Sequence, residues 1–476
     1  MKRTALIFIL TAILLFGVLS AENRSRIHHK NAHETEKSTD SCNRHSERNS
    51  EKVPVADIFE VMDKVDELSS LALWPGFEIP EIPVLIYDGL DTYQFHSASP
   101  HEGFIPIPEK TGVFIYEGQH PSVRGNSVVR LGDVWTATSV LSRASRRTQE
   151  RYSIRDMAGI VIHEQFHVFQ RTHHPEWRQN DGLLLIYPPE SVESLFLRRL
   201  EKEAFKKGAV DKDAAGAAAW AKEGLKFREK RLSLVDTPFA LYEKELQLTE
   251  GLSEYIEKIA RGSGPLVSSS ITDGIAPAGV RDLGYVEGRW IALILDKLKP
   301  DWKLLIENGE YEYLEDVLHA AVCDFDPSAG FSVGEMTEIK AEAKNDLKQW
   351  DADKKRQIET FYNRPGYRLE IDASSNPLRI RIFEPLEIEI VGDKQVFHKI
   401  IFAAGNDSGS LRVRHHPCVT VFDESYRIVK ILVTGLEEEP HIEEEKKLFK
   451  LDWDGISMEM KYSQARVDED RFVFTL

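Results

Sequence analysis

The sequence is poor in cysteine, in positive charge and in long apolar runs, and each shortage excludes a class of protein. Three cysteines in 476 residues are too few for a disulfide framework, although Cys323 and Cys418 could still pair in an oxidising compartment. The 61 Lys and Arg are outnumbered by 78 Asp and Glu, which gives a net charge of -17. Nucleic acids and anionic lipids favour clustered positive charge, so we expect no nucleic-acid partner.

The one long apolar run stands at the N-terminus. Lys2 and Arg3 precede apolar residues from Ala5 to Leu19, and two small residues follow. This order predicts a secretory signal peptide over residues 1–21, and the run is shorter than the about 20 residues that a spanning helix needs. We therefore expect an exported protein, periplasmic or extracellular, that is anchored to a membrane only if the signal stays uncleaved.

Changes in composition divide the rest of the chain into three parts. Residues 22–52 are rich in Ser, Asn, Glu and His and nearly lack large apolar residues, so we expect a disordered polar spacer. Its histidines could also bind metal loosely. Residues 53–365 carry strand and helix patterns, and residues 376–476 carry short apolar runs between turn residues. A chain of this length is expected to hold two or three domains.

The second part begins with a helical pattern and continues with strands rich in Val, Ile, Tyr and Thr. From Ser153 to Thr172 the apolar period becomes helical, and Ser153 with Asp156 is a plausible capping pair. The segments before it are a helix and four strands, Val55–Ala72, Pro83–Tyr87, Gly112–Tyr116, Ser127–Leu131 and Val134–Val140.

Helical patterns fill the rest of this part. We expect two charged helices over residues 189–232, one from about Pro238 to Arg261, and others from Val286 to Asn363. The C-terminal runs are spaced as in an antiparallel β-sandwich or small barrel. They are Leu378–Phe383, Leu386–Val391, Phe397–Phe402, Leu411–Arg414, Val419–Phe422, Ile428–Val433, Phe449–Asp452, Met458–Tyr462 and Phe472–Phe474. The sequence thus predicts an α+β chain with a C-terminal all-β sandwich-like domain.

One motif in the helix from Ser153 predicts a catalytic metal site. The run His163-Glu164-Gln165-Phe166-His167 fits the pattern HExxH. Residues four apart lie on one face of a helix, so both imidazoles can point at one tetrahedral Zn²⁺ ion. The glutamate beside them can take the proton of a water that zinc has acidified. With 16 histidines in the chain, a chance match is expected roughly 0.04 times, and the alternative is a helix with two uninvolved histidines.

A catalytic zinc needs a third protein ligand, and Glu250 is the first candidate. It lies on a polar stripe of the helix from Pro238 to Arg261, and Glu254 follows one turn later. Glu254 could accept a hydrogen bond from the outer nitrogen of a zinc-bound histidine. Gly251 lowers helix propensity by about 1 kcal/mol against Ala, which favours a close helix–helix approach here. The alternative for both glutamates is a solvated acidic face.

These residues resemble the gluzincin group of zinc metallopeptidases, whose members combine HExxH with a downstream glutamate ligand. The resemblance covers mainly residues 150–290 and implies a zincin-like domain over 53–365, in which residues 189–232 form a helical insertion. It implies that His163, His167 and Glu250 bind one zinc ion per chain. It also implies that Glu164 is the general base and that Glu254 orients a ligand.

A rival third ligand is His173, which stands ten positions after His163, as in the metzincin pattern HExxHxxGxxH. That pattern requires a glycine at position 170, where the chain must turn sharply, and this sequence has Gln170. The helix is therefore expected to continue, with His173 and His174 at a solvated helix end. We favour Glu250.

The oxyanion of a tetrahedral intermediate needs a hydrogen-bond donor. Tyr285 is the best candidate, since it is expected to begin the next helix and a similar tyrosine serves some gluzincins. Tyr255 is a weaker alternative, and either could be a packing residue. By analogy with zincins, the strand Val134–Val140 or Ser127–Leu131 could pair with an extended substrate.

Together these observations predict a zinc-dependent hydrolase, a peptidase that acts on peptides or proteins through attack by water. A second reading is an exported zinc-holding binding or sensor module without turnover. A third is a structural envelope protein in which the motif is accidental. A zinc-holding module without turnover does not need the carboxylate of Glu164, so the presence of this residue favours the hydrolase.

Overall fold

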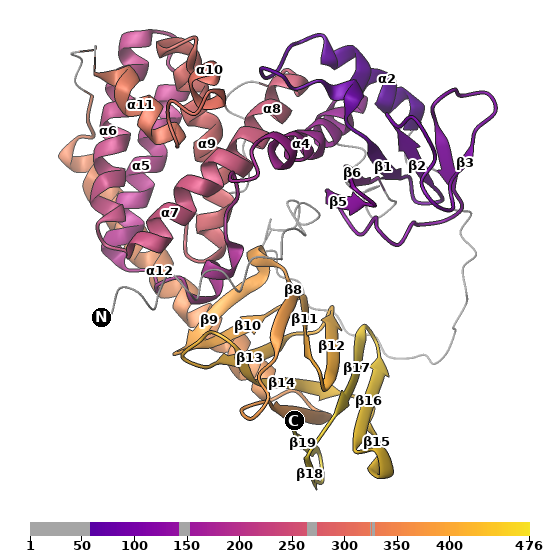
Figure 1. The fold of residues 1–476 in the computed structure, drawn as a ribbon. Helices are drawn as coiled ribbons and strands as arrows, with labels where there is room; N and C mark the ends of the chain where they lie inside the picture. The colour runs from indigo at the N-terminus through magenta and orange to yellow at the C-terminus, as the bar shows by residue number, and fades with distance from the viewer. Residues whose placement is uncertain (1–57, 142–152, 264–273, 324, 326–328) are drawn as a thin grey trace, which may run out of the picture. The chain divides into compact units, whose positions relative to one another are not determined.

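The computed structural model describes residues 58–141, 153–263, 274–323, 325 and 329–476 (Figure 1). The predicted signal peptide and the spacer lie outside these residues. The described chain forms two compact units. The motif unit comprises the described residues within Leu19–Glu176 and Ile256–Ser270, and the large unit those within Trp177–Tyr255 and Ile271–Leu476. The domain boundaries predicted from composition stay predictions.

The motif unit is built on a mixed sheet of six strands in the order β3-β4-β2-β1-β6-β5. Strands β1 and β6 are parallel, and the other pairs are antiparallel. All four predicted strands are confirmed, and β2 and β3 are additional. The elements are α2 Ile58–Ser69, η2 Ile79–Glu81, β1 Val84–Tyr87, β2 Thr92–Phe95, β3 Ile105–Pro106, β4 Phe114–Tyr116, β5 Ser127–Leu131, β6 Val134–Val140 and α4 Ile154–His173.

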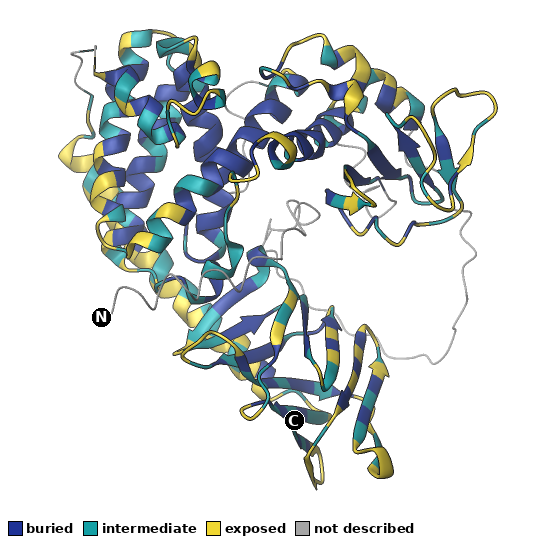
Figure 2. Cartoon of the chain, in the orientation of Figure 1, coloured by how far each residue is buried: buried dark blue, intermediate teal, exposed yellow. Residues whose placement is uncertain are grey.

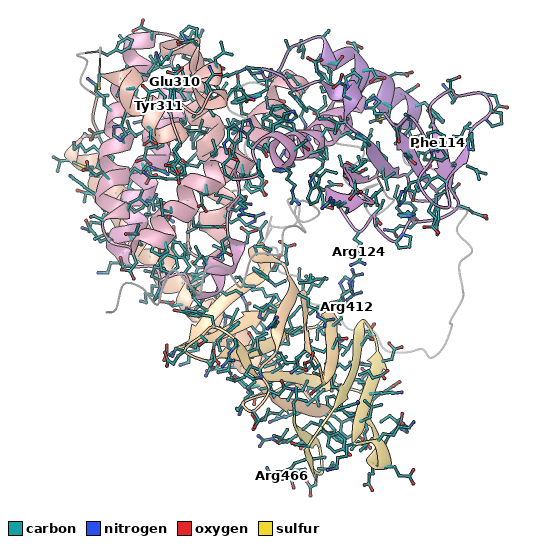
Figure 3. The ribbon with its side chains drawn as sticks, viewed as in Figure 1. Phe114, Arg124, Glu310, Tyr311, Arg412 and Arg466 are labelled. Carbon is teal, nitrogen blue, oxygen red and sulfur yellow. The ribbon has the colours of Figure 1, made fainter. Side chains whose placement is uncertain are left out.

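Helix α4 carries the HExxH motif and begins as predicted. The Ser153 hydroxyl accepts from the amide of Asp156, and the Asp156 carboxylate accepts from the amide of Ser153 at 2.9 Å, which completes a capping box. The helix packs against α2 and against β5 and β6. Phe114 lies in the small apolar cluster on the other strands of this unit (Figure 3).

The helices of the large unit include the predicted pair over 189–232, which forms the α5–α6 hairpin. Its helical elements are η4 Asp181–Ile186, α5 Val192–Val210, α6 Ala214–Leu232, α7 Thr237–Leu246, η5 Gln247–Gly251, α8 Leu252–Arg261, α9 Ala278–Leu298, α10 Trp302–Glu307, α11 Leu314–Val322 and α12 Val333–Tyr362. Helix α8 runs from the large unit into the motif unit. In Figure 2, α9 is buried along most of its length and α12 is largely exposed.

The predicted start of α9 is wrong. The helix begins at Ala278 and not at Val286, so Tyr285 lies in its interior. The stretch before Tyr285 contains two glycines, and glycine lowers intrinsic helix propensity. Nearly every residue from Gly279 to Leu295 is buried, and this packing overrides the local preference.

The predicted helix from Pro238 to Arg261 is confirmed as one continuous helical stretch, α7–η5–α8, with a π-helical turn at η5 that was not predicted. Here η5 crosses α9 closely. A Cβ added to Gly251 would lie 2.7 Å from the Cα of Gly288, so both backbones need glycine at the crossing. The expected close approach at Gly251 is thereby confirmed. π-Turns within α-helices occur frequently at functional sites.

The C-terminal region of the large unit is all β, as predicted, and forms two sheets. Their orders are β18-β19-β7-β14-β13-β10-β9 and β15-β16-β17-β12-β11-β8. The strands and short 3-10 turns are β7 Tyr367–Asp372, β8 Arg379–Phe383, η6 Pro385–Glu387, β9 Ile388–Gly392, β10 Gln395–His398, β11 Ile401–Asn406, β12 Gly409–Arg414, β13 Cys418–Phe422, β14 Ile428–Leu436, β15 His441–Glu443, η7 Glu444–Lys446, β16 Leu448–Trp453, β17 Ile456–Lys461, β18 Gln464–Asp468 and β19 Arg471–Thr475.

One expectation for this region is corrected. The run Phe397–Phe402 is not one strand, because β10 ends at His398 and β11 starts at Ile401 in the other sheet. Nothing in the run marks this turn, since it lacks Gly, Pro, Asn and Asp. Cys323 is exposed and Cys418 buried, and both are free thiols, so they do not pair.

The two sheets share their core with helices of the same unit. Buried residues of β7, β14 and β16 belong to one apolar cluster with residues of η4, α7 and α9, among them Leu184, Tyr242 and Val280. The β region is therefore packed as part of the large unit. At its far end, Arg466 lies on β18, whose five residues are all exposed (Figure 3).

His398 makes the stability of this region depend on pH. It is buried on β10 with Nε2 3.0 Å from the Thr420 hydroxyl, and burial lowers its pKa to about 3. The unfolded chain binds this proton near pH 6.5, so stability falls as pH drops from about 6.5 toward 3, by up to about 1.4 kcal/mol per pH unit. We expect urea unfolding at about pH 7.5 and about pH 5 to show a smaller pH effect in His398→Gln. Equal pH effects in both proteins would contradict this.

Within the described residues, no helix is long and apolar enough to cross a membrane.

Candidate metal centre

Helix α4 brings the two motif histidines together. His163 and His167 lie one turn apart, and their Nε2 atoms are 3.1 Å from each other. His163 is buried and His167 is half-buried. Glu164, the next residue, is buried as well. The inner nitrogens of both imidazoles thus converge on one point.

Each outer nitrogen lies near an acceptor oxygen. Nδ1 of His163 lies 3.0 Å from Oε2 of Glu257, and Nδ1 of His167 lies 2.9 Å from Oε1 of Gln170. In a neutral imidazole, an acceptor beside Nδ1 favours the tautomer that carries the proton there. In that tautomer both Nε2 atoms are unprotonated and can act as ligands.

This arrangement fits a zinc ion. Two unprotonated nitrogens 3.1 Å apart repel each other unless a cation or a proton lies between them. Tetrahedral Zn²⁺ with Zn–N distances of 2.0–2.1 Å separates two imidazole nitrogens by about 3.3 Å. The observed spacing is close to this value, so His163 and His167 could bind the ion without moving to other rotamers.

The carboxylate of Glu257 is fixed in turn from α8. Oε1 of Glu257 lies 2.8 Å from Nη2 of Arg261. Burial alone would raise the pKa of Glu257, but Arg261, His163 and Lys258 together hold it well below its usual value, so it stays charged. Gly159 on α4 leaves room for this arginine, since a Cβ there would lie 2.7 Å from Arg261 Cγ. Carboxylate–histidine pairs of this kind orient metal ligands.

Sequence reasoning did not single out Glu257. A signal existed, because Glu257 lies three residues after Glu254 and seven after Glu250, on the same face of a continuous helix. The proposed role of Glu254 toward a histidine stays a prediction. Within the large unit its Oε1 accepts from Nη1 of Arg289 at 3.1 Å.

The two middle positions of the motif anchor α4. The Gln165 side-chain amide donates to the carbonyl oxygens of Ile79 and Ile82, at 3.2 and 3.0 Å. The Phe166 ring packs edge-to-face on Trp74 and Phe77, with centroids 5.6 and 5.2 Å away. These contacts fix the rotation of the helix and with it the direction of both imidazoles.

Glu250 lies in the π-helical turn η5 and is buried. Its Oε1 accepts from Nε2 of Gln179 at 3.2 Å and from Nη2 of Arg281 at 3.1 Å. Two donors on one oxygen fix the carboxylate rotamer. η5 continues directly into α8, so Glu250 and Glu257 lie on one helical stretch.

The two candidate oxyanion donors differ. The Tyr285 hydroxyl accepts from Nη2 of Arg281 at 3.2 Å, so its own proton can be donated elsewhere. The Tyr255 hydroxyl instead donates to the carboxylate of Asp296, at 2.9 and 3.1 Å, and its ring packs on Trp302. Tyr255 is thus a packing residue, and Tyr285 remains the candidate.

The rival ligand His173 lies at the end of α4. The helix continues through Gln170 as expected, and His173 lies six positions after His167, a rise of about 9 Å. His173 is exposed and stacks on Phe169, with ring centroids 4.5 Å apart. His174 is buried, not solvated as expected. No turn brings His173 back toward the motif.

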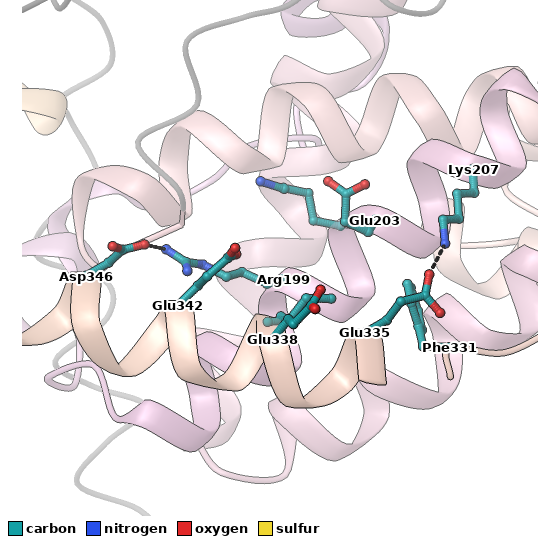
Figure 4. Close-up of a pocket in the computed structure, with 10 residues that line it drawn as sticks. Arg199, Glu203, Lys207, Phe331, Glu335, Glu338, Glu342 and Asp346 are labelled. Atoms are coloured by element: carbon teal, nitrogen blue, oxygen red, sulfur yellow. Dashed lines mark hydrogen bonds and ion pairs between the residues drawn. The ribbon is translucent and has the colours of Figure 1, made fainter. Parts of the chain in front are cut away.

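His163, His167 and Glu257 belong to the motif unit, and Glu250 and Glu254 belong to the large unit. A pocket of about 380 Å³ lies elsewhere, between α5 and α12 of the large unit (Figure 4). Two ion pairs, Arg199–Asp346 and Lys207–Glu335, join four of the charged residues that line it.

Comparisons with protein-family models, curated proteins and solved structures found no match.

Proposed function

We propose that the chain is a zinc-dependent hydrolase, a peptidase that cleaves peptide bonds with water. One observation carries this proposal. The Nε2 atoms of His163 and His167 face each other at 3.1 Å, while acceptor oxygens lie near both Nδ1 atoms. Glu164 follows His163 in the helix and is buried, and a purely structural zinc site does not need its carboxylate.

In this proposal His163, His167 and Glu250 hold one zinc ion. Zinc, when bound, polarises the scissile carbonyl and acidifies water. Glu164 takes the proton of the attacking water and passes it to the leaving nitrogen. The Tyr285 hydroxyl donates to the oxygen on which negative charge develops. Glu257 keeps His163 in the tautomer that leaves Nε2 unprotonated.

The substrate strand would pair with β5. Strand β6 lies between β1 and β5 and is hydrogen-bonded on both sides, so it cannot accept a further strand. Strand β5, Ser127–Leu131, is the sheet edge and packs against α4. An extended peptide can therefore add antiparallel or parallel to this edge next to the motif helix.

Zinc content of the full chain tests the proposal. We expect about one zinc per chain by elemental analysis. The ion should be lost in His163→Ala and Glu250→Ala and kept in His173→Ala. Zinc loss in His173→Ala with retention in Glu250→Ala would show that His173, and not Glu250, is the third ligand. A wild-type chain that binds no zinc after reconstitution would show that the HExxH match is accidental. It would favour the third hypothesis, a structural envelope protein.

Exchange of Glu257 for glutamine should weaken zinc binding. Glu257→Gln keeps the size of the side chain but removes the charge that orients His163, and loss of such a partner costs about 10- to 100-fold in metal affinity. Competition with a chromogenic chelator measures this. The control is Glu229→Gln, the same change at an exposed helical position. Equal affinities of the two variants would contradict the role of Glu257.

A further inference from the structure

Arg281 joins two residues of the proposed site. It lies on α9, one turn before Tyr285, and is buried. Its Nη2 is 3.1 Å from Oε1 of Glu250 and 3.2 Å from the Tyr285 hydroxyl. One nitrogen of one guanidinium therefore contacts both the proposed third ligand and the proposed oxyanion donor.

The other end of the guanidinium is fixed independently. Nη1 of Arg281 donates to Oδ1 of Asp181 at 2.9 Å, and the Tyr242 hydroxyl donates to the same oxygen at 3.0 Å. Arginine presents its donors in a rigid planar fork. Since Asp181 holds one side of the fork, the direction of the other side toward Glu250 and Tyr285 is set.

Three carboxyl groups surround the guanidinium of Arg281. The carboxylates of Asp181 and Glu250 face a single guanidinium. A third carboxylate, Glu384 beside the η6 turn of the β region, interacts with Arg281, and η6 packs on α9. Burial raises the pKa of Asp181 and raises the pKa of Glu384 to about 7, so the guanidinium does not face three full negative charges.

We propose that Arg281 is a positioning residue. It holds the carboxylate of Glu250 and the hydroxyl of Tyr285 in a fixed position relative to each other. This inference rests on the proposed function. Arg281 would fix the carboxylate rotamer for the metal and aim the phenol proton at the reacting oxygen. Because Asp181 lies in η4 and Glu384 lies beside η6, the surroundings of Arg281 also link the β region to the proposed site.

Four variants of the full chain test this, with zinc affinity and kcat measured separately. Arg281→Gln should lose about 10- to 100-fold in zinc affinity and should also lose kcat when saturated with zinc. Tyr285→Phe should lose kcat and keep zinc affinity, and Glu250→Gln should lose zinc affinity. Arg281→Lys keeps the positive charge and should fold. One ammonium group cannot donate in the two directions of the guanidinium, so zinc affinity and kcat should both stay below the wild-type values.

The outcomes separate the two proposals. A wild-type chain that binds no zinc would overturn both. Wild-type zinc binding with unchanged zinc affinity and kcat in Arg281→Gln would overturn only the role of Arg281. If Arg281→Gln does not fold by circular dichroism, Arg281→Lys decides, and wild-type values of both quantities in that variant would overturn the role.

Discussion

Glu164→Gln is expected to abolish turnover while zinc stays bound. Glutamine has the size of glutamate but cannot take a proton, and a positioned general base contributes about 10²- to 10⁴-fold. Glu164 is not a ligand in the proposed site, so its exchange should leave zinc at about one per chain. A screen of a peptide mixture by mass spectrometry identifies a substrate for wild type, and kcat is then compared at saturating zinc.

The matched control is again Glu229→Gln, which should keep wild-type kcat. Retained activity in Glu164→Gln would show that Glu164 is not the general base. Zinc binding in wild type together with no cleavage of any peptide would favour the second reading, an exported binding or sensor module that holds zinc without turnover. Loss of zinc in Glu164→Gln would contradict the assignment of Glu164 as a base and not a ligand.

Arg231→Met is expected to cause the largest loss of stability. Arg231 is fully buried in α6, and its guanidinium donates four hydrogen bonds of 2.6–3.0 Å to the carboxylates of Glu201 and Glu243. Its removal leaves the buried carboxylate of Glu201 with Arg228 and that of Glu243 with Arg198 as remaining cations, and breaking such a buried network costs about 3–5 kcal/mol. Urea unfolding measures the change in the free energy of unfolding.

Arg356→Met is the control for this change. Arg356 is an exposed residue of α12 that pairs with Asp353 three positions earlier, and such surface pairs contribute about 0–1 kcal/mol. Arg and Met have similar helix propensities, so the backbone contribution is the same in both variants. Equal destabilisation of the two proteins would show that the buried network around Arg231 does not carry the stability assigned to it.

Local patterns predicted much of the fold. The capping box at Ser153 and the strands Ser127–Leu131 and Val134–Val140 are found at the predicted residues, because each depends on side chains adjacent in sequence. The motif histidines at four-residue spacing likewise converge as helix geometry requires. The zincin-like assignment and the zinc site stay proposals.

Features that depend on contacts between distant segments escaped prediction. The interior position of Tyr285 follows from burial of α9, which overrides its glycines. Glu257 acquires its role only because Gly159, on another helix, admits Arg261. The π-turn at Glu250 has no local sequence signature. Spacing alone therefore found the ligand candidates but not the residues that orient them.

X-ray absorption at the zinc edge tests the central claim, that two imidazoles and a carboxylate surround one zinc ion. The account predicts two nitrogen ligands from imidazole and otherwise oxygen, at about 2.0–2.2 Å, without sulfur. His167→Ala should lose the zinc signal, as the other ligand variants do. A spectrum with three imidazoles or with sulfur, or one unchanged in His167→Ala, would contradict the account.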